Sequence, residues 1–329
     1  MLAIVTCFFA GTQVLHAAEG GRLPMLSSDE AWGKLPGAPA ESQPLPGWAR
    51  MLAGPMPKTT AAMLELDAHH RTGDRLPAVL RGKLRWVAAD ANKCDYSKTV
   101  AVADLRRAGQ TDADLAGLTA GKSINDAERA ALDFARKMMV DANTVTDEDV
   151  KKLIGHYGDK QVVGIVTLIA HAAFQDRMLL ALHLPADEKS TAPVTAKFTR
   201  MRTPVGPPPK PPPGFKPILP DENKAVAVVD TEWKNKTYSD LQSGLGGQKE
   251  RVSRIRIPDW TEVGPKLPAE SWGHRLPRVY WNRVAYAYQP EATDLWFDCV
   301  DQFRQENKMD RVLQQYVFWI VTRSIDCFY

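Results

Sequence analysis

Four cysteines limit the thiol chemistry that this chain of 329 residues could perform. They stand at positions 7, 94, 299 and 327, and no two of them form a CxxC motif. None has the cysteine and histidine spacing of a zinc site, so any thiol chemistry must depend on single cysteines. A lone cysteine in an apolar helical region is more often a small core residue than a nucleophile, and we expect this of Cys94.

Histidines are the second group of residues that could do chemistry. His69 and His70 follow Glu65 and Asp67 on one predicted helix and could in principle bind a metal. Adjacent histidines point in different directions on a helix, so we expect solvent-facing polar residues there and no metal site. His171 lies in an apolar helix and is expected to be a hydrogen-bonded core or subunit-contact histidine and not a catalyst. The sequence indicates no metal and no cofactor.

The sequence around these residues predicts a series of successive helices. Apolar residues recur at helical spacing, and capping residues, prolines or glycines mark the ends. No segment alternates with a period of two, so the predicted fold is all-α. The expected helices are 61–70, 78–91, 96–108, 111–120, 123–139, 146–154 and 160–184.

Two further segments divide the chain. Nine prolines between residues 204 and 220 favour an extended polyproline spacer, and we place a linker at 191–222. Residues 1–18 are nearly uncharged, apolar and end in small residues, which is typical of a secretory signal peptide. The mature protein is therefore expected to be secreted or periplasmic, with no membrane association after signal removal.

The two sides of the linker are related by a repeat. An offset of 327 − 94 = 233 residues, applied without gaps, gives 11 identities in the 53 positions from 44 to 96, where chance would give roughly three. The matches include Trp48/Trp281, Trp86/Trp319 and Cys94/Cys327. A period this long indicates duplicated domains. We expect a first domain at 23–190 and the N-terminal part of a second, truncated one at 223–329.

Several motifs in the first copy suggest a family. They are Trp86-Val-Ala-Ala-Asp-Ala-Asn-Lys-Cys-Asp-Tyr-Ser97, Leu105-Arg-Arg-Ala-Gly109, Ala127-Glu-Arg-Ala-Ala-Leu-Asp-Phe-Ala135, Val145-Thr-Asp-Glu-Asp-Val150 and Phe174-Gln-Asp-Arg177. Together they resemble the carboxymuconolactone decarboxylase-like superfamily and its alkylhydroperoxidase D-like branch. The resemblance implies a helical bundle of that type and an oligomeric, thiol-dependent peroxidase or oxidoreductase.

The same resemblance implies a specific site. Redox-active members have a CxxC motif at a helix start, a histidine four residues later and a glutamate one helix earlier. A helix N-terminus lowers a thiol pKa, and the second thiol resolves the sulfenic acid. In the first copy Cys94 takes the place of the first cysteine and Ser97 that of the second. Ala101 replaces the histidine, and Gly82 and Lys83 lie where the glutamate is expected, so this motif is degenerate.

The second copy keeps less of the site. Its motif consists of Cys327 and Tyr329, with Gln314 and Gln315 near the glutamate position. We predict that the full-length form is a thiol-dependent peroxidase with its centre in this second copy and that the chain as given is inactive. One alternative is a non-catalytic, oligomerising helical scaffold, and another is a non-redox enzyme of the lactone or acid decarboxylase type.

The net charge of the chain limits the kinds of molecule that it is expected to bind. The chain has 42 basic and 39 acidic residues, a formal excess of +3, which gives no large cationic field for nucleic acid. The expected partners are a small peroxide or lactone substrate and further copies of the chain, because family members associate through helical faces.

Overall fold

The computed structural model describes residues 22–37, 43–121, 125–186, 191–198, 237, 239–240, 253–275 and 280–324. Throughout these ranges the regular secondary structure is helical and there is no strand, which confirms the all-α prediction. The predicted signal peptide, the proline-rich run at 204–220 and the terminal residues 325–329 lie outside the described residues.

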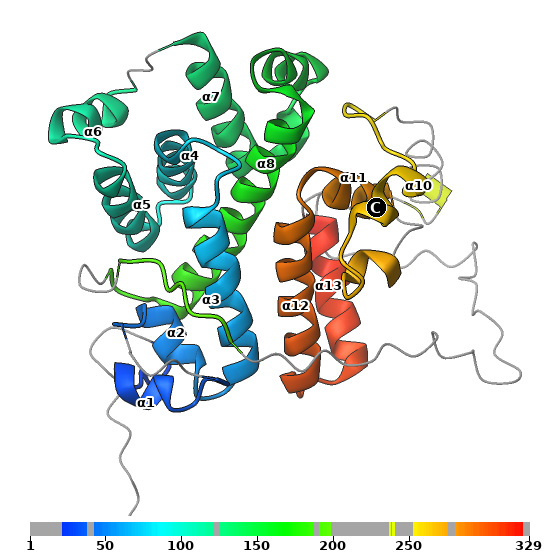
Figure 1. Cartoon of the computed structure of the whole chain (residues 1–329). Coiled ribbons are helices and arrows are strands. Elements are labelled where there is room, and N and C mark those ends of the chain that lie inside the picture. Colours follow the sequence, from blue (N-terminus) through cyan, green and yellow to red (C-terminus); the bar gives the residue numbers. More distant parts are fainter. Residues whose placement is uncertain are drawn as a thin grey trace, which may run out of the picture.

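The helices of the first part of the chain lie together in Figure 1, and their side chains form two hydrophobic clusters. One is built around α4, which packs against α5, α7 and α8. The other joins α1, α2 and α3 to the end of α8. The helices of this part are α1 (Ser28–Trp32), α2 (Gly47–Leu52), α3 (Pro57–Thr72), α4 (Ala78–Ala91), α5 (Asp95–Arg107), α6 (Asp112–Thr119), α7 (Asp126–Val140), the short η1 (Ala142–Thr144) and α8 (Asp147–Leu182).

Local capping explains several helix starts. Thr111 and Thr146 each form a capping box with an aspartate three residues later, and Asn125 caps α7. The prediction for α3 began four residues too late. Pro57 starts that helix, because proline suits the first helical position, where no backbone N–H is needed.

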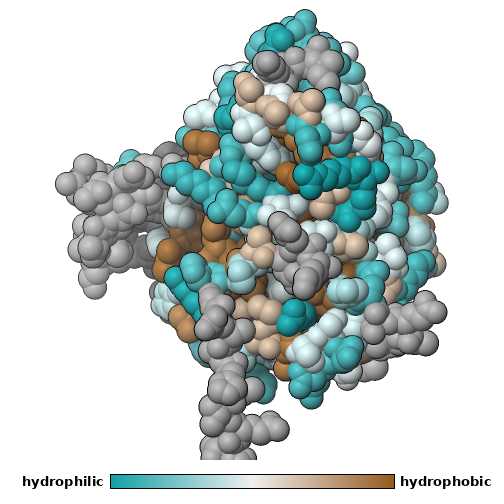
Figure 2. Space-filling model, turned by 90° about the vertical axis from the view of Figure 1, so that its left-hand side faces the viewer, coloured by the Kyte–Doolittle hydropathy of each residue, from teal (hydrophilic) through white to brown (hydrophobic). Residues whose placement is uncertain are grey.

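Helix α8 is long and contains a kink. It joins the two helices predicted at 146–154 and 160–184 through Gly158, whose φ of 70° a side chain would strain. By length and apolar composition it is the single helix among the described residues that could cross a membrane. Its apolar side chains pack in the cluster with α4 and α7, which indicates a core helix. Figure 2 shows hydrophilic and hydrophobic residues interspersed on one face of the molecule.

The last part of the chain repeats the helix bounds of the first. It contains α10 (Trp260–Val263), η3 (Gly264–Lys266), η4 (Trp272–Arg275), α11 (Tyr280–Tyr288), α12 (Pro290–Glu306) and α13 (Arg311–Ser324). Adding 233 to the bounds of α4 gives those of α13, and adding it to the start of α3 gives the start of α12. The residues before α3 and α12 also share a conformation, with φ, ψ of −142°, 61° and −139°, 58°.

Helices α3 and α12 lie side by side and run in opposite directions (Figure 1). At one end, Glu306 accepts hydrogen bonds from the backbone N–H groups of Lys58 and Thr59, at 2.8 and 2.9 Å. At the other end, Glu291 lies 3.7 Å from His69. Since Glu291 is the counterpart of Lys58 at the 233 offset, each helix start contacts the end of the other helix.

Equivalent positions of the two parts differ in burial. Leu80 and Trp86 on α4 are each 8% exposed, whereas their counterparts Leu313 and Trp319 on α13 are 52% and 55% exposed. In the first part α5, α7 and α8 cover α4, and no described helix covers α13 in this way. The bounds of α4 and α13 therefore correspond at the 233 offset, whereas the helices that surround them differ.

Candidate functional site

Cys94 is a buried residue at the start of α5. It is 1% exposed and occupies the position that precedes the helix, with its Sγ 3.5 Å from the Oγ of Ser97. Burial raises the pKa of the Cys94 thiol and outweighs the hydrogen bond with Ser97. A thiol that is both inaccessible and hard to deprotonate is a poor nucleophile, in agreement with its expected role as a core residue.

The positions expected to relay protons near Cys94 hold no acid or base that could do so. Ala101 is buried, and Lys83 forms an ion pair with Glu128 on α7. Gly82 packs against α5 so closely that an added Cβ would come 2.7 Å from Cδ2 of Leu105. A glutamate at position 82 would therefore require the Leu105 side chain to move, so the packing between α4 and α5 favours glycine there.

The other cysteine that the structure describes is Cys299, which is buried on α12 and packs in the same hydrophobic cluster as Cys94. Among the described residues neither of the two forms a disulfide. Cys327 and Tyr329 lie outside the described residues.

A buried ionic network lies between α3, α5 and α8, and the sequence analysis did not predict it. Arg71 donates to Asp67 at 3.1 Å and makes a two-pronged contact with Asp104, at 2.9 Å for each nitrogen. Gln175 donates to Asp67 at 3.1 Å and accepts from Arg85. The i, i+4 spacing of Asp67 and Arg71 was the one sequence signal for it.

This network sets the charge of Asp67. Burial raises the pKa of that carboxyl, but the guanidinium groups of Arg71 and Arg85 outweigh the effect and hold its pKa well below the usual range. Asp67 is therefore ionised in the folded protein, compensated by the guanidinium groups around it.

His70 and His171 stack beside Asp67. Their ring centroids are 4.5 Å apart at an interplanar angle of 20°, and His171 is 5% exposed. Burial lowers the pKa of both rings, more strongly than Asp67 raises it, so both are neutral. Neither ring nitrogen of His171 has a hydrogen-bond partner, although Nε2 lies 3.7 Å from Asp67. His171 is thus buried in the core, as expected, but the hydrogen bond expected for it is not formed.

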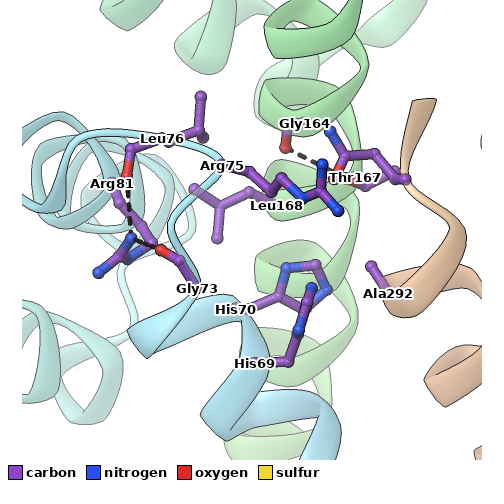
Figure 3. A pocket seen from close by; sticks show the side chains of 11 residues that line it. His69, His70, Gly73, Arg75, Leu76, Arg81, Gly164, Thr167, Leu168 and Ala292 are labelled. Carbon is purple, nitrogen blue, oxygen red and sulfur yellow. Dashed lines mark hydrogen bonds between the residues drawn. The ribbon is translucent and has the colours of Figure 1, made fainter.

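The expectation for the other polar residues of α3 was wrong in part. Asp67 is buried, and His69 and His70 are half-buried, because α8 and α12 cover this side of the helix. Figure 3 shows the two histidines beside α8 and Ala292, lining a hollow of about 30 Å³. Within the described part of the chain no group of His, Cys, Asp and Glu is arranged to hold a metal ion.

A larger, mainly apolar pocket of about 260 Å³ lies between α3, α8, α11 and α12. His70, His171, Trp281 and Trp296 are among its lining residues. The pocket thus lies where the helices of the first part of the chain meet those of the last part.

Comparison with known families, with curated proteins and with solved structures finds no match for this chain.

Proposed function

We propose that this protein is a fused pair of carboxymuconolactone decarboxylase-like units and that its first unit is a non-redox helical scaffold. The antiparallel contact between α3 and α12 carries the proposal. In it, the start of each helix contacts the end of the other, with Lys58 at Glu306 and Glu291 at His69, an arrangement that two similar units related by an approximate two-fold axis can form. A duplicated gene product can form within one chain the interface that a homodimer forms between two.

The state of Cys94 supports the non-redox role. A peroxidase cycle needs an accessible thiolate, a second thiol and groups that relay protons. Around Cys94 burial opposes the thiolate, Ser97 stands where the second thiol is needed, and Ala101 and Gly82 have no titratable group.

Other functions remain predictions. A peroxidase centre in the second unit depends on Cys327 and Tyr329, and a lactone or acid decarboxylase would need a polar substrate pocket. Export to the periplasm or outside the cell and association into homo-oligomers are likewise predictions.

Peroxide consumption measured with a dithiol reductant tests the proposal. We expect negligible turnover by the wild-type chain, because the second thiol and the relay residues are missing around Cys94 and the loss of one member of a catalytic set normally costs orders of magnitude. Cys94→Ser should therefore leave the rate unchanged. Cys327→Ser serves as the comparison. Robust turnover that disappears in Cys94→Ser would overturn the scaffold assignment, and turnover that disappears only in Cys327→Ser would favour the peroxidase.

A further inference from the structure

Four arginines converge on one cavity of the first unit. Arg71, Arg81, Arg85 and Arg107 line a space of about 240 Å³ between the end of α3, α4 and the end of α5. Asp104 is the single acidic residue in the lining. Arginine presents planar N–H groups that match the oxygens of phosphate and carboxylate, so this composition is that of an anion site.

The charges around the cavity do not balance. The four guanidinium groups face Asp104 in the lining, Asp67 behind Arg71 and the buried carboxylate of Asp176, which acts on His171 together with Arg85. Asn92 donates a hydrogen bond to Asp176 but is neutral, so the count leaves an excess of 4 − 3 = 1 positive charge. Burial lowers the pKa of Arg81 by more than the negative charge of Asp104 raises it.

Hydrogen bonds hold the arginines in place before any ligand arrives. Arg81 donates to the carbonyl oxygens of Gly73 and Leu76, as Figure 3 shows. Arg107 donates to Asp104 and to the Thr191 carbonyl. Arg85 uses one terminal nitrogen for Gln175, and its other terminal nitrogen is buried without a hydrogen-bond partner. Such preorganisation reduces the entropy that binding costs.

We infer that this cavity binds a small oxyanion with two negative charges, such as a phosphate group or a short dicarboxylate. Several arginines can make charge-assisted hydrogen bonds to one dianion, and the cavity is too small for a nucleotide-sized molecule, whose pockets are commonly larger than about 300 Å³. The site is separate from Cys94 and is not part of the scaffold role proposed above.

Calorimetric titration at constant ionic strength tests the inference. The probes are inorganic phosphate and malonate as dianions, with acetate and chloride as monoanions. We expect saturable binding of phosphate or malonate, the stronger of the two identifying the ligand source, and at least about tenfold weaker binding of acetate. Dianion binding no stronger than acetate binding would refute the site, and this comparison needs no variant.

Variants then locate the site. Arg81→Gln and Arg107→Gln should each weaken dianion binding by about tenfold, as expected when one member of a charged contact is removed, and Arg81→Lys should lie in between. Arg106→Gln is the matched control, because it removes the same charge from an exposed position beside Arg107. Circular dichroism checks that each variant is folded. Equal losses in Arg106→Gln and Arg107→Gln would show a general charge effect and would also overturn the inference.

Discussion

At the scale of single residues, opposing effects on one thiol decide what the first unit can do. Cys94 stands at a helix start, where the backbone N–H groups favour a thiolate. Its side chain is nevertheless in the hydrophobic cluster of α1, α2 and α3, and burial raises its pKa. The desolvation effect is the larger one, so the same position that activates a cysteine in a redox enzyme holds a core residue here.

The buried histidines make stability depend on pH. Burial lowers the pKa of His70 and His171 in the folded state, so below about pH 6.5 the unfolded chain binds more protons and stability falls. The low pKa of Asp67 adds a second loss below about pH 4. When the pH is lowered from about 7.5 to about 5.5, the unfolding free energy of the His171→Leu variant should fall by about 1 kcal/mol less than that of the wild type.

Urea unfolding at the two pH values measures this difference. His156→Leu, which changes an exposed histidine on the same helix, should behave as the wild type does. An equal loss in His171→Leu and the wild type would show that His171 is not the group that titrates.

At the scale of helices, a side chain from the end of α12 caps the start of α3. No side chain of α3 caps its start, and Glu306 from the end of α12 accepts hydrogen bonds from Lys58 N, Thr59 N and Thr59 Oγ1. A carboxylate at a helix N-terminus also interacts favourably with the helix dipole. We expect Glu306→Ala to destabilise the protein by about 1–2 kcal/mol, the typical cost of losing a cap.

The effect of Glu306→Ala is measured by urea unfolding against Glu291→Ala. Glu291 is mostly exposed and forms one longer contact with His69, so its loss should change the unfolding free energy by less than about 0.5 kcal/mol. Similar effects of the two variants would contradict the capping role of Glu306.

At the scale of the whole molecule, α13 exposes many apolar side chains to solvent. Eight of its apolar residues are exposed, namely Val312, Leu313, Tyr316, Val317, Phe318, Trp319, Ile320 and Val321. Exposed apolar patches of this kind promote association, and large aromatic residues contribute most of the area. We therefore expect concentration-dependent self-association that the double variant Phe318→Glu/Trp319→Glu strongly reduces.

Sedimentation velocity over a range of concentrations measures that association. Val140→Glu is a suitable control, because Val140 is an isolated exposed apolar residue on α7 and should not affect it. A wild-type chain that stays monomeric at high concentration would show that the exposed α13 face is tolerated in solution.

The sequence by itself predicted the all-α class and six of the helices of the first part, α3 to α8, but not α1 and α2. Local signals suffice for several of them: capping residues begin α6, α7 and α8, and periodic apolar residues define the buried face of α4. The offset of 233 carries the predicted start of α4 at residue 78 to residue 311, where α13 begins, but it carries the late start predicted for α3 to residue 294, four residues after α12 begins at Pro290.

Only the tertiary structure decided which polar residues are buried together. Asp67, Asp104 and Gln175 are far apart in the sequence, and their meeting around Arg71 and Arg85 depends on how α3, α4, α5 and α8 pack. The arginine cavity arises in the same way, from side chains of three helices. Helical periodicity shows which side of a helix is apolar but not which other helix will cover it, so neither the ionic network nor the anion site could be predicted from the sequence.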